Sequence, residues 1–177
     1  MTKHELDAIH AMLASPHVSE PTRRALQARL ETRYERQFLS EAEFARLQAA
    51  AVRLVPHDPA ELDLSGPIDH RLSTGQSGDG WRYAELPPDG EAYRALLAAL
   101  PDGFATQDGE TQDAALSAVQ ESHARIFEDL LSELTEHFMA HPLTQYRFGY
   151  AGFADVPGWP EVGPNELEPR EETYGPR

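Results

Sequence analysis

Cysteine is absent from the 177 residues of this chain, and lysine occurs only once, as Lys3. Without cysteine the chain has no disulfide, no thiolate zinc site, no iron–sulfur ligand and no thiol nucleophile. Because its single lysine lies near the N-terminus, a Schiff-base lysine and a phosphate-loop lysine are almost excluded. The composition therefore removes several classes of enzyme before any pattern is considered.

Long apolar runs are also missing, and basic side chains are few. No stretch approaches the ~18 apolar residues that a membrane-spanning helix needs, so we expect no membrane insertion. Fifteen basic side chains stand against 30 acidic ones, for a formal net charge of −15. Since nucleic acids and membrane surfaces are themselves anionic, we expect this chain to bind neither of them. Its charge favours solubility and can steer it toward a basic patch on a partner.

Sustained alternation of apolar and polar residues, which would indicate β-strands, does not occur. Apolar residues recur instead at helical spacing, so the sequence predicts an all-α fold, an irregular multi-helix bundle. The clearest helix start is a capping box formed by Ser40 and Glu43, with Leu39 and Phe44 placed as a hydrophobic staple. The predicted helices cover residues 4–13, 20–37, 40–54, 67–72, 93–100, 110–121 and 125–141.

The character of the sequence changes at Pro142, where a proline-rich segment begins. We predict a helical extension over residues 1–37, a helical core domain over 38–141 and an extended tail over 142–177. Six prolines forbid long helices in the tail. Solvated tails are usually poor in aromatic residues, so the rings of this one should pack on its own domain or on another chain. The predicted partner-binding residues are Tyr146, Phe148, Tyr150, Phe153 and Trp159.

Glu133, His137 and His141 are the best candidates for a metal site. On a helix they fall at i, i+4 and i+8, and one carboxylate with two imidazoles can bind zinc or iron(II). The alternative is that both histidines lie at the edge of an apolar helix face or at an interface. No second Glu/His helix is present to complete a di-metal site. We favour the alternative and predict no metal site.

No set of catalytic residues can be identified. The glycines at 75, 78 and 80 do not match the dinucleotide-binding fingerprint, and no strand precedes them. The 30 acidic residues are scattered, so no pair can be singled out for acid–base chemistry. The nucleophile elbow of serine hydrolases is also absent. The sequence predicts a chain that is not catalytic alone and binds no cofactor.

Four stretches of the chain resemble the gluconate 2-dehydrogenase subunit 3 family. They are residues 38–56, 87–94, 127–135 and 149–171. The first and third are ordinary helix starts and faces. The most distinctive feature is the Gly-Tyr-x-Gly…Pro-Gly-Trp pattern that begins at Gly149 and ends at Trp159. The resemblance covers most of the chain.

The resemblance implies a small subunit that binds a larger flavoprotein of the glucose–methanol–choline (GMC) type. The flavoprotein would hold FAD and oxidise a sugar, sugar acid or polyol, while the small subunit would help it to fold, mature or be exported. Many family members begin with a twin-arginine export signal. Here Arg23 and Arg24 are followed by Glu31, Arg33 and further charges rather than an apolar stretch. We therefore expect a cytoplasmic chain, periplasmic only if exported with a partner.

Two other functions remain open from the residues alone. The chain can be a stand-alone helical binding or scaffold protein that self-associates, with its tail packed on a second copy. It can also be a helical metal enzyme that uses Glu133, His137 and His141.

Overall fold

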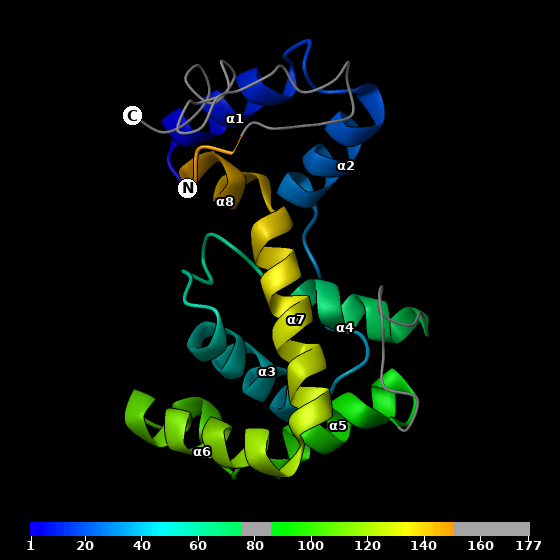
Figure 1. Ribbon diagram of the computed structural model, residues 1–177, viewed down its shortest axis with the longest axis vertical. Coiled ribbons are helices and arrows are strands. Elements are labelled where there is room, and N and C mark those ends of the chain that lie inside the picture. The colour runs from blue at the N-terminus through cyan, green and yellow to red at the C-terminus, as the bar shows by residue number, and fades with distance from the viewer. Residues whose placement is uncertain (76–85, 151–177) are drawn as a thin grey trace, which may run out of the picture. The chain divides into compact units, whose positions relative to one another are not determined.

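The computed structural model describes residues 1–75 and 86–150, and this part of the chain is helical throughout (Figure 1). No strand occurs among the described residues, so the predicted all-α fold class is confirmed. The elements are α1 (Lys3–Leu13), α2 (Glu20–Glu31), α3 (Glu41–Leu54), α4 (Ser65–Thr74), α5 (Asp89–Ala99), the 3-10 turn η1 (Phe104–Thr106), α6 (Gly109–Ser122), α7 (Ala124–Ala140) and α8 (Pro142–Arg147).

The predicted capping box at the start of α3 is present. The Ser40 hydroxyl accepts the Glu43 N–H at 3.3 Å, and the Glu43 carboxylate accepts the Ser40 N–H at 2.7 Å. Leu39 is buried and Phe44 packs against the same apolar cluster. A second capping box begins α1, where the Thr2 side chain accepts the Glu5 N–H and the Glu5 side chain accepts the Thr2 N–H. Each box satisfies amide groups that a helix start leaves without partners.

Two segments differ from the sequence-based expectation. The second helix ends at Glu31 rather than at residue 37, and its C-cap residue Thr32 has extended backbone angles. The chain beyond it is held by hydrogen bonds to Asp69, which replace those of a helix. Residues 142–147, which we expected to be extended, form α8. Pro142 stands in the first turn of α8, where its missing N–H costs nothing.

The chain divides into two compact units. Unit 1 contains Met1–Thr32 and the described residues from Met139 onward, and unit 2 is Arg33–Phe138. The predicted N-terminal extension thus groups with the start of the predicted tail. The divisions fall after residues 32 and 138, whereas the sequence placed them after 37 and 141. The remainder of the predicted tail, residues 151–177, lies outside the described residues.

Unit 2 is built around α3, which packs against η1, α4, α5 and α6. Its core also includes the apolar stripe of α7, the strongest apolar face in the sequence. Leu47, Ile68, Phe104 and Leu134 are fully buried at the centre of this core. Burying a side chain of this size contributes about 1.5–3 kcal/mol before the entropy of ordering is subtracted.

Unit 1 has a smaller core of its own. In it α8 packs against both α1 and α2, which also contact each other. The buried apolar residues are Ile9, Met12, Leu13, Val18, Leu26, Leu30 and Leu143. The first 32 residues therefore share one core with the start of the predicted tail, although the two stretches are far apart in the sequence.

None of the helices in the described part of the chain has the length and apolar character that crossing a membrane requires.

Candidate partner-binding surface

The end of α8 has a fully hydrogen-bonded backbone. Gly149 adopts a left-handed conformation, with φ of +71°. This turn lets the Gly149 N–H donate to the Tyr146 carbonyl at 3.0 Å, and the Tyr150 N–H donate to the Gln145 carbonyl at 2.8 Å. The pair of bonds is a Schellman motif, in which glycine is preferred because a Cβ opposes the left-handed conformation. The backbone positions of Phe148 and Tyr150 are therefore defined by the motif.

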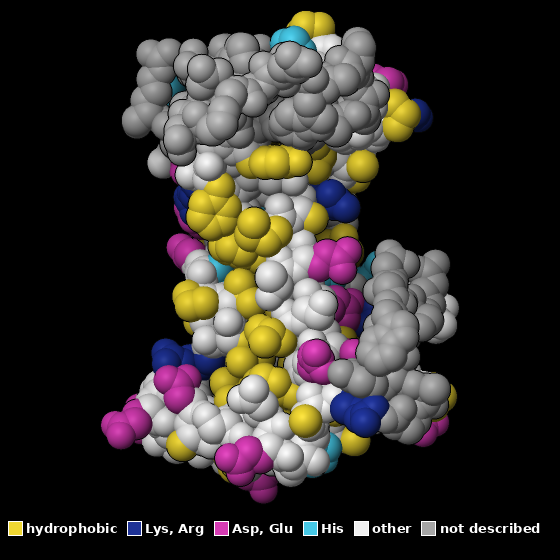
Figure 2. Space-filling view, viewed as in Figure 1, with side chains coloured by type: hydrophobic (Ala, Val, Ile, Leu, Met, Phe, Trp, Pro, Cys, Tyr) yellow, Lys and Arg dark blue, Asp and Glu magenta, His cyan; other side chains and the backbone are white. Residues whose placement is uncertain are grey.

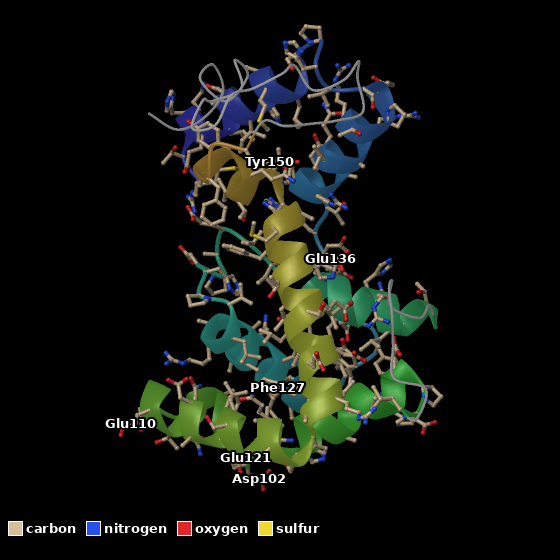
Figure 3. The ribbon with its side chains drawn as sticks, in the orientation of Figure 1. Asp102, Glu110, Glu121, Phe127, Glu136 and Tyr150 are labelled. Carbon is tan, nitrogen blue, oxygen red and sulfur yellow. The ribbon has the colours of Figure 1, made fainter. Side chains whose placement is uncertain are left out.

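The predicted partner-binding aromatics have different surroundings. Tyr146 is partly buried and packs against the core of unit 1. Phe148 is 64% exposed and Tyr150 is 46% exposed. Figure 3 labels Tyr150, which lies three residues after the last residue of α8. Phe153 and Trp159 lie outside the described residues.

Exposed apolar side chains concentrate in this part of the sequence. Four large hydrophobic residues are exposed in the described part of the chain, and three of them, Met139, Phe148 and Tyr150, fall within residues 139–150. Figure 2 shows hydrophobic side chains at the surface around α8. Single exposed apolar residues are ordinary, whereas contiguous apolar patches mark interaction sites. We name Met139, Phe148 and Tyr150 the apolar segment.

The metal candidate Glu133 belongs to a network of charged groups in unit 2. Its Oε1 accepts from Arg71 Nε at 2.7 Å, and its Oε2 accepts from Arg71 Nη2 at 2.8 Å. The Tyr93 hydroxyl also donates to Oε2, at 2.5 Å. Arg71 Nη1 donates in turn to the Asp89 carboxylate at 2.6 Å. The bidentate geometry between Arg71 and Glu133 is the strongest form of such an ion pair.

This network shifts the pKa of Glu133 and Tyr93, and the Glu133 carboxylate raises the pKa of Arg71. Burial acts to raise the pKa of Glu133, but hydrogen bonds and the positive charge of Arg71 outweigh it and lower the pKa to about 2. Arg71 and Tyr93 lie at hydrogen-bond distance from this carboxylate, and His137, whose Nε2 lies 3.7 Å from Glu133 Oε1, also lowers its pKa. Burial and the Glu133 carboxylate raise the pKa of Tyr93 well above its usual value. Both side chains therefore keep their ordinary charge at neutral pH.

Of the three metal candidates, His137 lies beside Glu133, with 3.7 Å between His137 Nε2 and Glu133 Oε1, whereas His141 has separate contacts. Glu133 is committed to Arg71 and Tyr93, whereas His141 belongs to unit 1, where its Nδ1 accepts the Leu143 N–H at 3.2 Å and caps α8. Within residues 1–75 and 86–150, no three histidine or acidic side chains are grouped as metal ligands. His141 thus helps to begin the helix that carries the apolar segment.

Sequence reasoning missed Asp69 and the Arg71–Asp89–Tyr93 contacts. Asp69 is fully buried. Its Oδ2 accepts the Gln37 N–H at 2.5 Å, and its Oδ1 accepts the Leu39 N–H at 2.7 Å. The one available signal was spacing, because an acid and a base at positions 69 and 71 lie between the buried Ile68 and Leu72 of α4. The partners of these charges come from distant parts of the chain, which spacing does not reveal.

Comparisons of the chain with protein-family models, with curated proteins and with solved structures found no match. The class that the structure defines is an all-α protein with two hydrophobic cores.

Proposed function

We propose that this chain is a non-catalytic subunit that binds a larger FAD-dependent dehydrogenase of the GMC type and stabilises or matures it. The substrates of that partner would be sugars, sugar acids or polyols, and the FAD would be held by the partner. The observation that carries the proposal is the exposure of Phe148 and Tyr150 at the closed end of α8, at 64% and 46%.

The physical properties of this segment suit an interface. Aromatic side chains bury a large apolar area with few rotatable bonds, so binding costs them little conformational entropy. The Schellman motif at Gly149 already orders the backbone that carries Phe148 and Tyr150. A preordered backbone reduces the entropy lost on association. Aromatic residues and methionine are also enriched at interface cores, and the apolar segment consists of both.

The choice of partner rests on the resemblance described above. Gly149 and Tyr150 begin the most distinctive stretch of that resemblance. The structure places them at the end of α8, next to the exposed ring of Phe148. The feature that resembles the family and the feature that is exposed therefore coincide in the chain.

The test is co-expression of the tagged chain with GMC-type flavoproteins encoded in the same genome. We expect a complex that retains bound flavin through purification. The double variant Phe148→Ser/Tyr150→Ser should weaken the complex by about tenfold or more, because truncating a central aromatic commonly costs 2 kcal/mol or more. The matched control, Phe148→Leu/Tyr150→Phe, keeps the apolar area and should bind nearly as well as the wild type.

Substitution is a better test here than truncation. Deleting the chain after Pro142 would also remove Leu143, which is 2% exposed and belongs to the core of unit 1. A truncated chain could lose the complex merely because unit 1 unfolds. If the serine double variant binds as tightly as the leucine/phenylalanine control, the apolar segment is not the interface. If the wild type instead forms homodimers that the serine variant loses, a second copy is the occupant and the proposal is wrong.

A further inference from the structure

We propose that α1 and α2 form a positioning platform for the apolar segment, and that the Glu5–Arg147 ion pair sets its orientation. This inference rests on the proposed function and assigns a role to the N-terminal 32 residues. The platform consists of three contacts to the segment around α8: an apolar core, an ion pair and a helix-end hydrogen bond.

The first contact is apolar. α8 has only six residues, and isolated helices shorter than ~12 residues are marginal in water. Its Leu143 is 2% exposed, in a cluster with Ile9 and Leu13 of α1 and Leu26 of α2. The short helix therefore depends on α1 and α2 for its stability. Without them the backbone of Phe148 and Tyr150 would not be ordered.

The second contact is polar and lies next to Phe148. Arg147 Nε donates to Glu5 Oε1 at 2.9 Å, while Oε2 of the same carboxylate accepts the Thr2 N–H at 2.7 Å. The Glu5 side chain is 17% exposed and the Arg147 side chain is 45% exposed. The hydrogen bond from Arg147, with that from the Thr2 backbone, lowers the pKa of Glu5 to about 2. One carboxylate thus joins the start of α1 to the end of α8.

The third contact holds the chain just before α8. Arg29 Nη1, from α2, donates to the Ala140 carbonyl at 3.3 Å. A cation at this position also interacts favourably with the negative end of the α7 dipole. Ala140 follows Met139 directly, so this bond fixes the chain beside the first member of the apolar segment. The segment is therefore held at both ends, by α2 before α8 and by α1 after it.

These contacts explain why neighbouring residues of α8 differ in exposure. Tyr146 packs against the unit 1 core, while Phe148 is 64% exposed. A six-residue helix held only by Leu143 could rotate about its axis and exchange these two rings. The ion pair of Arg147 opposes that rotation because Glu5 is itself fixed by the capping box of α1. Glu5 and Arg147 thus act as positioning residues for the apolar segment.

The test uses the full chain with two readouts, hydrogen exchange and affinity for the co-expressed GMC-type flavoprotein. In Glu5→Gln the new side chain still fits the capping box, but the charge that binds Arg147 is lost. We expect the Gly149 and Tyr150 amides to exchange about 2- to 5-fold faster, as the loss of one partly exposed ion pair implies. The affinity for the flavoprotein should fall by a similar factor, and Arg147→Met should behave alike.

Two variants serve as controls. Asp7→Asn removes the same charge from the same helix, but Asp7 pairs with Lys3 at 2.6 Å and should change neither readout. Arg147→Lys keeps the charge and should restore most of the affinity lost in Arg147→Met. Exchange of the α3 amides in unit 2 should be the same in all variants, which separates positioning from general destabilisation.

The outcomes distinguish the two proposals. Unchanged exchange at Gly149 and Tyr150 in Glu5→Gln would overturn the platform, even if the wild type binds the flavoprotein. Faster exchange with unchanged affinity would overturn it too, since the orientation of the segment would then not matter for binding. If no wild-type complex forms at all, the proposed function fails, and the platform keeps its support only if exchange is faster in Glu5→Gln than in Asp7→Asn.

Discussion

Asp69 shows how one buried carboxylate can order a stretch of backbone. Its side chain has no exposed area, and it accepts the amide protons of Gln37, Phe38 and Leu39. A buried carboxylate is tolerated only where hydrogen bonds replace its lost hydration, and three amide donors supply them here. The same bonds hold the chain just before the start of α3.

Asp69→Asn should therefore destabilise the protein. The asparagine side chain carries an NH2 group, and this group would face the backbone N–H donors that the carboxylate now accepts from. At least one buried N–H would then have no acceptor, which costs about 1–3 kcal/mol. The midpoint of urea unfolding, followed by circular dichroism, measures the change. Glu121→Gln, which removes one charge at an exposed position of α6, should leave the midpoint almost unchanged. Equal midpoints for the two variants would mean that Asp69 does not order the segment.

Glu133 makes the stability of the protein depend on pH in the acid range. Its pKa falls from 4.5 to about 2 on folding. A lowered folded-state pKa means that the stabilisation is fully present above pH 4.5 and is lost as the pH falls toward 2. Glu133→Gln should lose about 3 kcal/mol at neutral pH, because Arg71 is left without its bidentate partner.

The measurement is the free energy of unfolding across the acid range for Glu133→Gln and for Glu136→Gln. Glu136 is an exposed acid on the same helix, α7, and is labelled in Figure 3. The Glu133 variant should show a flatter dependence on pH between 4.5 and 2 than the wild type. The Glu136 variant should follow the wild type. A Glu133 variant with the wild-type slope would show that other groups cause the acid sensitivity.

At the scale of helices, local signals determine where most elements begin. Ser40 begins α3 through its bond to the Glu43 N–H. Ser40→Ala should lower the free energy of unfolding by about 1 kcal/mol, the usual cost of losing an N-cap side chain. Ser117→Ala changes an exposed serine in the middle of α6 and should be neutral or slightly stabilising, because alanine is the better helix former. Thermal unfolding of both variants tests this; equal losses would contradict the assignment.

The helices that sequence predicted well are those with local signals. A capping box and an apolar stripe predicted the bounds of α3 almost to the residue. For the other helices predicted from the sequence, apolar spacing indicated that a helix exists. The end of α2 was not predictable, because the bonds to Asp69 that replace helical ones come from 30 to 32 residues away. The helix at 142–147 was missed because proline was weighed as a helix breaker and not as a residue of the first turn.

The candidate surface was predictable only in part. The sequence singled out the aromatic residues after Pro142 as a group, but the exposure of Phe148 and the partial burial of Tyr146 depend on how α8 packs. The pairing of Glu133 with Arg71 spans 62 residues in sequence. Contacts between residues so far apart leave no periodic pattern in a single sequence. The sequence alone therefore could not decide whether Glu133 belongs to a metal site.

At the scale of the whole molecule, the two separate cores predict separate local unfolding. Leu13 belongs to the core of unit 1 and Leu47 to that of unit 2, and both are fully buried. Each Leu→Ala substitution should cost about 2–5 kcal/mol. By hydrogen exchange, Leu13→Ala should speed exchange mainly in α1, α2 and α8, and Leu47→Ala mainly in α3 and its neighbours. Equal acceleration throughout, in both variants, would indicate a single cooperative unit.

Net charge also differs between the units and bears on association. Unit 2 contains 20 acidic and 8 basic residues, for a net charge of −12, out of −15 for the chain. Charge of one sign speeds encounter with an oppositely charged surface and is screened by salt. Apolar contacts at the segment around α8 would instead persist at high salt. If added salt lowers the association rate of the complex and leaves its dissociation rate unchanged, charge governs the encounter and apolar contacts hold the complex together.

We propose that the chain acts by binding a flavoprotein. Light scattering combined with flavin absorbance on the co-expressed pair measures this binding. We expect one particle whose mass is the sum of the two chains or a multiple of it, which carries FAD and oxidises a sugar, sugar acid or polyol. Separate particles, with all flavin in the one that lacks this chain and no loss of its stability, would contradict it. So would oxidation of such a substrate by this chain alone.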